Sequence, residues 1–213
     1  MNQWLLEEIN RNPKTTLKRF NVDQYLRLIE AGILEEGTSC ELLDGYIVLR
    51  NSADSADERT SIGTRHAAAL NSLVRRLILH LAQSNWSVNC LSPIALNRQY
   101  APEPDLAVIQ GKNSDYLSHF PGPGVIQLIV DIADSRSLRR HDNLAEKYAQ
   151  HSIPEYWIVS LPDQHLEVYD LPERELGRYA RRQILKASDT VKLTIPGVPA
   201  LLLSVQEILN ATV

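Results

Sequence analysis

The order of apolar and polar positions along the chain predicts helices that alternate with short strands. From residue 62 to about residue 83 the apolar residues recur at helical spacing, and His66 lies one turn before the first of them. A second helix is expected over residues 138–150 and a short one near residues 204–210. The stripe of the first helix consists of Leu70, Leu73, Val74, Leu77, Ile78 and Leu81.

Short runs rich in Val, Ile and Leu, separated by Pro and Gly, predict strands between these helices. The helix over 138–150 lies between two such runs, which implies a parallel crossover inside a mixed sheet. The pattern therefore indicates one α/β domain over residues 1–213, with C-terminal strands and a helix after residue 170. The expected strands are 86–96, 104–110, 125–132, 153–159 and 165–171.

The N-terminal part predicts two helices and a hairpin. Residues 3–11 have a helical pattern that Pro13 ends, and Asn21 or Asp23 is a candidate cap for a helix that reaches Ala31. Residues 40–49 (CELLDGYIVL) predict a hairpin, because two apolar runs flank an Asp-Gly turn. Residues 51–60 are polar and acidic without periodicity, and we expect a loop there.

Composition places the chain among ordinary globular proteins, with 44% hydrophobic and 23% charged residues in 213. No apolar stretch approaches the roughly 20 residues that cross a bilayer, and acids interrupt the N-terminus where an export signal needs an apolar core. We therefore expect a cytoplasmic protein without membrane contact, in which Cys40 and Cys90 are reduced. The net charge of −4 counts against a tight non-specific DNA binder.

Two acidic residues interrupt or border apolar strands, and both are candidates for chemistry. Asp105 begins the run PDLAVI, and alternation places it on the same face as Ala107 and Ile109. Asp131 lies within LIVDIADS and shares a face with Ile129. If the two strands are neighbours, the carboxylates can converge, and a hard cation such as Mg²⁺ or Mn²⁺ would offset their repulsion. The structural alternative is a turn at Asp105, and an ion pair or hydrogen bonds from backbone N–H groups at Asp131.

Three further polar residues fall on sides expected to face the core. Glu41 lies inside the first apolar run of the hairpin. Lys147 lies one turn after Leu144 on the helix 138–150, so it either points inward to carboxylates or extends to the surface. His66 begins the buried stripe of its helix, where a structural histidine is the common alternative to a functional one.

Several of these motifs, in this order, resemble a bacterial family. The chain is similar to the Uma-two domain proteins in a series of motifs. These are ELLDG (41–45), a helix with His66, PDLAVI (104–109), LIVDIADS (128–135), Asp142 with EKYA (146–149) and IPEYWIV (153–159). The Uma-two domain proteins are proposed restriction endonucleases of the PD-(D/E)XK nuclease superfamily. The resemblance covers about residues 20–170 and implies a restriction-endonuclease-like core, a mixed β-sheet flanked by helices.

The resemblance also implies roles for single residues. Asp105 would be the metal-binding acid of the PD element, and Asp131, where the family usually has Glu, would be the second. Lys147 would be the catalytic lysine, displaced to the helix, because the usual lysine position is Ala133. The main-chain carbonyl of Ile132 would complete the metal ligands.

Glu41 would act as an accessory acid near the metal and His66 as a polar group beside the site. The activity implied is a Mg²⁺- or Mn²⁺-dependent endonuclease acting on nucleic acid, most simply DNA, in a homodimer. Ala133–Ser137 departs from the family's usual Ser-Pro-Ser, and this departure and the acidic charge motivate a different class, a catalytically inactive nucleic-acid-binding or assembly module. A structural dimer with an exposed hairpin is a third class.

Overall fold

The computed structural model describes residue 11 and residues 17–34, 40–49, 63–133 and 138–210. Its centre is a six-stranded mixed sheet in the order β3-β4-β5-β6-β7-β8. Strands β5 and β6 pair in parallel, and the other neighbours pair antiparallel. The strands are β3 (Trp86–Cys90), β4 (Leu106–Gln110), β5 (Ile126–Ala133), β6 (Glu155–Ser160), β7 (His165–Glu173) and β8 (Arg178–Lys186).

The parallel pair is joined by the helix α4 (Leu138–Gln150), which confirms the predicted crossover. Parallel neighbours need such a long connection because a tight turn can only reverse the chain. Leu144 of α4 is buried, as the sequence indicated. The mixed α/β fold is thus as predicted.

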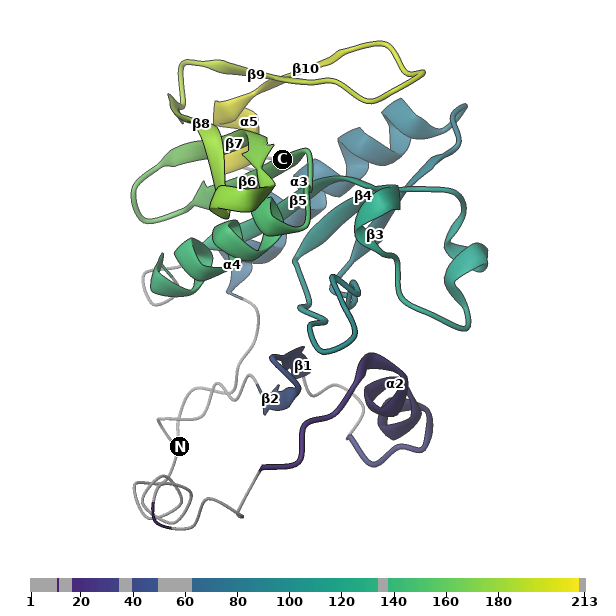
Figure 1. Cartoon of the computed structure of the whole chain (residues 1–213). Helices are drawn as coiled ribbons and strands as arrows, with labels where there is room; N and C mark the ends of the chain where they lie inside the picture. The colour runs from purple at the N-terminus through teal and green to yellow at the C-terminus, as the bar shows by residue number, and fades with distance from the viewer. Residues whose placement is uncertain (1–10, 12–16, 35–39, 50–62, 134–137, 211–213) are drawn as a thin grey trace.

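Two apolar layers cover the two faces of the sheet (Figure 1). On one face, α3 (Thr64–Leu81) packs on Leu106, Leu128 and Val130. On the other face, α4 packs on Ala107, Ile129 and Ile158, together with residues from the stretch 94–100. Successive residues of β4 and β5 therefore face different layers, as strand geometry requires.

The buried face of α3 is narrower than the sequence pattern indicated. Leu70, Leu73, Leu77 and Leu81 are buried, but Ile78 is 52% exposed. Residues four apart stack on one side of a helix, whereas Ile78 is turned about 100° from Leu77. The prediction that Ile78 belongs to the core is wrong for this reason.

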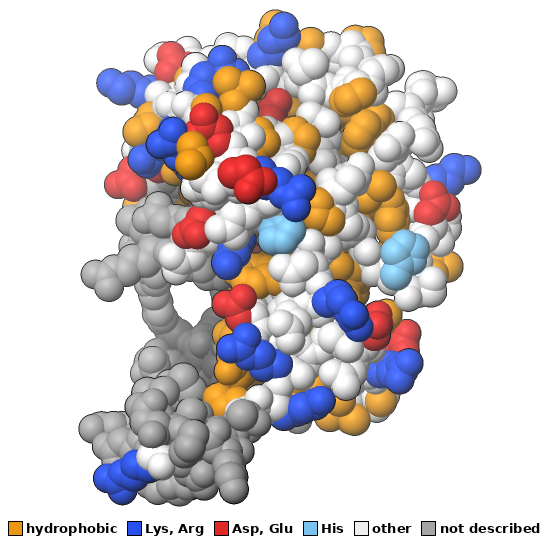
Figure 2. Space-filling model, in the orientation of Figure 1, with side chains coloured by type: hydrophobic (Ala, Val, Ile, Leu, Met, Phe, Trp, Pro, Cys, Tyr) orange, Lys and Arg blue, Asp and Glu red, His pale blue; other side chains and the backbone are white. Residues whose placement is uncertain are grey.

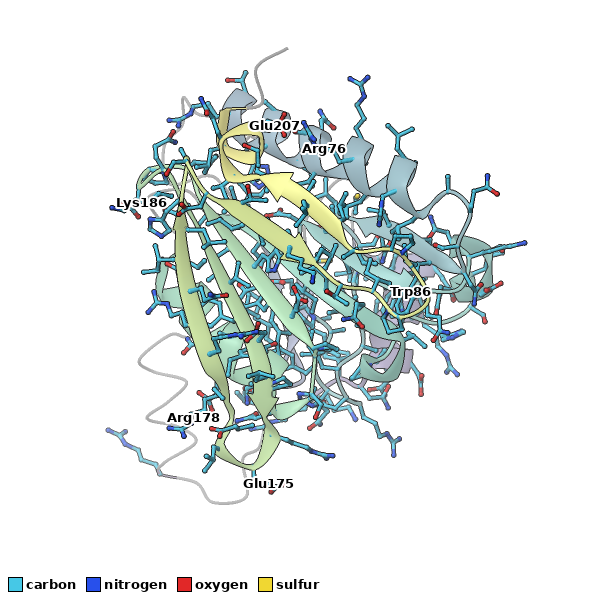
Figure 3. The ribbon with its side chains drawn as sticks, turned by 90° about the horizontal axis from the view of Figure 1, so that it is seen from above. Arg76, Trp86, Glu175, Arg178, Lys186 and Glu207 are labelled. Carbon is cyan, nitrogen blue, oxygen red and sulfur yellow. The ribbon has the colours of Figure 1, made fainter. Side chains whose placement is uncertain are left out.

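A C-terminal unit covers the α3 layer. It consists of β9 (Thr190–Leu193) and β10 (Leu201–Ser204), which pair antiparallel, and α5 (Val205–Asn210). In Figure 3, Arg76 of α3 lies beside Glu207 of α5, and their side chains are 2.8 Å apart. Trp86 Nε1 also donates to the carbonyl of Pro196, between β9 and β10. The C-terminal strands and helix expected after residue 170 are present.

The N-terminal part forms a separate group below the sheet in Figure 1. Helix α2 (Val22–Glu30) begins at Asn21, whose side chain accepts from the Gln24 N–H, and β1 (Cys40–Leu43) and β2 (Tyr46–Leu49) form the predicted hairpin. A bridge between Leu42 and Ala101 fastens the hairpin to the segment before β4.

The remaining expectations differ in detail. The strand expected over 86–96 ends at Cys90, and the Arg-rich segment after residue 177 is the edge strand β8. Short 3-10 turns are present at η1 (Asn113–Tyr116), η2 (Pro123–Val125) and η3 (Arg174–Leu176). The helix expected over 3–11 and the loop expected over 51–60 lie outside the described residues, except Arg11. In the described part of the chain, no helix is both long and apolar enough to span a bilayer.

Candidate active site

Asp105 and Asp131 lie opposite each other where β4 and β5 end their pairing. The last paired residues are Leu106 and Val130, so one further step of the antiparallel register brings Asp105 to Asp131. Each aspartate has the same orientation as the residue two positions along its strand, on the α4 face of the sheet. The register thus brings together the two carboxylates that sequence alternation had placed on one face.

Side chains replace the backbone ladder at this point. Oδ2 of Asp105 accepts from the Ile132 N–H at 2.6 Å, and Oδ1 of Asp131 accepts from the Asp105 N–H at 3.3 Å. Asp105 is 8% exposed and Asp131 2%. Burial of carboxylates is tolerated where donors such as these hydrogen-bond them. The two bonds hold both carboxylates in fixed positions relative to the backbone.

Tyr156 is a site residue that the sequence analysis missed. Its hydroxyl donates to Oδ2 of Asp131 at 2.8 Å, and its ring packs edge-on against Tyr148, with centroids 4.9 Å apart. Tyr156 therefore joins helix and sheet, and it also holds an acid. The sequence does carry one signal for this position: Tyr156 and Ile158 are two residues apart in one strand and so lie on the same face. Its place beside Ile129, however, depends on how β5 and β6 pair.

His66 contacts the same acid from α3. Its Nε2 is 3.2 Å from Oδ2 of Asp105, and the side chain is 18% exposed. Nε2 donates to the carboxylate, so a neutral imidazole leaves Nδ1 as an acceptor. Within the described chain that Nδ1 is buried and has no hydrogen-bond partner. The structure thus places His66 beside Asp105, one of the two acids.

Glu41 contacts the segment that precedes Asp105, and Lys147 contacts an aromatic ring. Oε1 of Glu41 accepts from the Glu103 N–H at 2.8 Å, two residues before Asp105. The Lys147 ammonium lies over the ring of Tyr100, with Nζ 5.7 Å from its centroid. Among the residues that the structure describes, Lys147 makes no ion pair with a carboxylate. The aromatic ring face stabilises this half-buried cation, whereas the sequence analysis named carboxylates as the partners of an inward Lys147.

The donor set fits a hard divalent cation that keeps water. Two carboxylates side by side supply oxygen ligands, and Mg²⁺ is commonly bound through one or two carboxylates with several waters retained. Over the described ranges, no three residues of His, Cys, Asp or Glu come close enough to form a protein-only metal cage. The arrangement therefore suits an open site, and Asp105 and Asp131 are the residues that could hold the ion.

Charge on one face of the molecule is mixed. On the face shown in Figure 2, basic and acidic side chains are interspersed, and no large area has one sign. Arg65, next to His66, is fixed at the sheet end because its Nη2 donates to the Leu161 carbonyl at 3.1 Å. The Leu161 N–H donates in turn to the carbonyl of Ala133, the residue that stands where the resemblance would place a catalytic lysine.

Comparison with known proteins agrees with this fold. The chain is similar to the crystal structure of a putative nuclease belonging to DUF820 from Anabaena variabilis ATCC 29413, with a TM-score of 0.66. The two share 14% sequence identity, and the match covers 90% of this chain and 98% of the other. The likeness defines a mixed α/β fold of the kind found in that nuclease-like protein.

A family model identifies the chain more closely. The Uma2 model, described as "Putative restriction endonuclease", matches residues 22–206. The chain therefore belongs to the Uma2 family. The match extends through β7, β8 and the hairpin β9–β10. No protein with a curated description matches the chain.

Proposed function

We propose that this protein is a metal-dependent endonuclease that hydrolyses phosphodiester bonds of DNA. The observation that supports this most directly is the pair Asp105 and Asp131, held opposite each other by reciprocal bonds to backbone N–H groups. Membership of a family whose description reads "Putative restriction endonuclease" supports nucleic acid as the substrate. The proposal rests on the site and the family together, because a fold alone does not imply an activity.

In this proposal Asp105 and Asp131 hold Mg²⁺ or Mn²⁺, and the carbonyl of Ile132 is a further ligand. The bound ion supplies Lewis acidity toward a phosphoryl oxygen and toward water. Tyr156 keeps Asp131 oriented through its hydroxyl, since a free carboxylate would rotate between several positions. His66 does the same for Asp105.

Lys147 and Glu41 have roles that depend on substrate. The Lys147 ammonium lies over Tyr100, and a bound phosphate would offer it a stronger partner than the aromatic ring. There it would stabilise charge that develops on the phosphate. Glu41, bonded to the segment that precedes Asp105, is the accessory acid.

Cleavage of supercoiled and linear DNA, with RNA in parallel, tests the proposal. The protein is assayed with Mg²⁺, with Mn²⁺ and with EDTA, and cleavage is expected only with metal. Asp105→Asn and Asp131→Asn remove a charge with little change in shape and should reduce the rate about 100-fold or more, because a missing ligand removes most of the metal's contribution. Lys147→Ala should cost about 10²–10³-fold.

Matched controls separate chemistry from folding. Lys192→Ala removes an exposed lysine of β9, and Glu146→Gln alters the exposed neighbour of Lys147. Both should cleave like the unmodified protein. Unchanged cleavage in Asp105→Asn and Lys147→Ala would refute the assignment of the site.

The competing class, an inactive nucleic-acid-binding module, predicts a different pattern. Such a protein binds DNA with an affinity that falls as salt rises, and it shows no metal-dependent cleavage with any substrate. Ala133 at the usual lysine position is the observation that favours this class. We also propose a homodimer, for which sedimentation at several concentrations is the direct measurement.

A further inference from the structure

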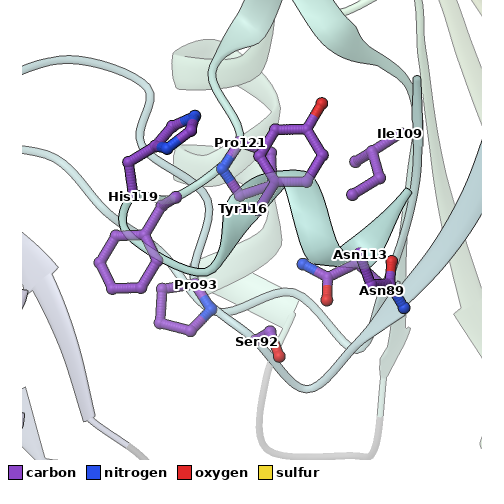
Figure 4. A pocket seen from close by; sticks show the side chains of 9 residues that line it. Asn89, Ser92, Pro93, Ile109, Asn113, Tyr116, His119 and Pro121 are labelled. Carbon is purple, nitrogen blue, oxygen red and sulfur yellow. The ribbon is translucent and has the colours of Figure 1, made fainter. Parts of the chain in front are cut away.

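A pocket of about 190 Å³ lies beside β3 and β4. Ile109, Ser92 and two prolines line part of it. Aromatic rings come from Tyr116, His119 and Phe120, and carboxamides from Asn89 and Asn113. Figure 4 shows Tyr116 between His119 on one side and the two asparagines on the other. No role in the proposed site has been given to any of these residues.

The pocket walls are fastened to the sheet. The Tyr116 hydroxyl donates to the Gln110 carbonyl at 2.5 Å, which fixes the ring. Ser87 of β3 donates to the carbonyl of Gly111 at 2.8 Å, and the Ala95 N–H donates to the carbonyl of Pro121 at 2.8 Å. A ligand that enters this pocket meets groups that are already ordered, so little freedom is lost on binding.

The pocket lies on the same sheet face as the two aspartates. Asn89 pairs with Ala107, and alternation aligns Ala107 and Ile109 with Asp105. Two to four strand residues separate them, which is about 7–14 Å at 3.3–3.4 Å per residue. A stacked nucleic-acid strand advances about 3.4 Å per nucleotide. The pocket is therefore about two to four nucleotides from a phosphate held at Asp105.

The lining chemistry matches a flat, polar-edged ring. Aromatic side chains stack on nucleobases, and carboxamides pair with base edges, as Asn does with adenine. Within the described part of the chain, the side-chain amides of Asn89 and Asn113 make no hydrogen bond. The volume is below the roughly 300–1,000 Å³ of pockets that enclose drug-sized ligands, so it suits one ring system.

We propose that this pocket binds one unpaired nucleobase of the substrate strand, two to four nucleotides from the phosphate at Asp105. The inference rests on the proposed function for the identity of the strand. It adds a recognition site to that function: the substrate has a single-stranded, flipped or frayed base near the point of cleavage. Phosphate contacts position a strand, whereas base contacts of this kind distinguish one substrate from another.

Binding without divalent metal tests the proposal independently of cleavage. The full chain in EDTA is titrated by fluorescence anisotropy with a labelled 12-nucleotide strand of deoxyadenosine and with a 12-nucleotide strand of abasic sites. The two probes have the same phosphates and differ only in their bases. The deoxyadenosine strand should bind about 5- to 150-fold more tightly, the range expected for a stacked base.

Variants locate the effect in the pocket. Asn113→Ala and His119→Ala alter exposed positions that do not support the core, and each should reduce the preference for the deoxyadenosine strand several-fold. Affinity for the abasic strand and its salt dependence should not change, because the phosphate contacts remain. Leu117→Ala is the matched control, since Leu117 is 85% exposed, lies on the same loop and does not line the pocket.

The outcomes separate this proposal from the proposed function. A preference that persists unchanged in both pocket variants overturns the pocket proposal, even if DNA is cleaved. A preference lost in the variants supports it, even if no cleavage is found. Equal binding of the two strands, or binding of neither, overturns it.

Discussion

Tyr156→Phe removes one hydroxyl from the candidate site and leaves the ring in place. That hydroxyl donates to Oδ2 of Asp131 at 2.8 Å, and Tyr156 and Asp131 are 0% and 2% exposed. Water cannot easily replace the lost donor at this depth. A hydrogen bond to a charged group contributes about 1.5–3 kcal/mol, so the free energy of unfolding should fall by that amount.

Equilibrium unfolding in urea measures this loss. With a slope of about 2–3 kcal/mol/M, the midpoint should fall by roughly 0.5–1.5 M while the slope remains constant. In the proposed reaction, Asp131 would also lose its orientation. The metal concentration needed for half-maximal cleavage should therefore rise, whereas cleavage at saturating metal changes less.

Tyr169→Phe is the control for this substitution. Its hydroxyl donates to Oε2 of Glu167 at 2.6 Å, also on the α4 face, so a similar loss of stability is expected without a change in metal dependence. A double-mutant cycle of Tyr156→Phe with Asp131→Asn should give a coupling energy above about 0.5 kcal/mol. Additive effects in this cycle would refute the reasoning that the hydroxyl acts through Asp131.

Three other changes should alter stability. Burial, as the largest cause, raises the pKa of Glu155 to about 7, so the folded protein binds this proton more tightly than the unfolded chain and stability falls as pH rises from 4.5 to about 7. Glu155→Gln should abolish a decline of about 3 kcal/mol in the free energy of unfolding across this range, as urea unfolding at several pH values measures, and an unchanged pH profile would contradict the assignment. Burial also acts on Glu167, but hydrogen bonds from Tyr169 and His165 and the charge of Arg182 lower its pKa overall. The Glu167 carboxylate therefore stabilises the fold at pH values above its pKa in the unfolded chain. Glu167→Gln should lower the free energy of unfolding more at neutral pH than near pH 3, and an equal loss at both pH values would count against a charge effect. Gly45 has a φ of 81°, and an added Cβ would lie 2.7 Å from Cβ of Arg19. Gly45→Ala should therefore lower the free energy of unfolding by about 1–3 kcal/mol. An unshifted melting temperature would argue against this close approach.

Much of the local structure follows from short-range pattern. Asn21 begins α2, Asp44 and Gly45 make the hairpin turn, and the spacing of Leu70, Leu73 and Leu77 forms the buried face of α3. These features depend on neighbours within about four residues, which is why the sequence alone predicts them. Alternation likewise placed Asp105 and Asp131 on defined faces of their strands.

Pairing between strands depends on contacts that are distant in sequence. Asp105 lies opposite Asp131 only because β4 and β5 are neighbours in one register, and a slip by one residue would turn one acid toward the other face. The parallel register of β5 and β6 places Tyr156 beside Ile129 and within reach of Asp131. No local pattern reports which strands pair.

Packing between layers decided the remaining positions. For Lys147 the sequence left an inward and a surface position open. The ring that its ammonium lies over belongs to Tyr100, which is held in the segment linked to the hairpin. Glu41 is fixed by the Glu103 N–H, and His66 reaches Asp105 from the opposite layer. Apart from Ile78, the sequence by itself indicated which apolar residues of α3 and which strand faces point inward, because strand and helix periods are local. The tertiary structure alone decided which inward residues meet, because side-chain contacts depend on how the layers pack.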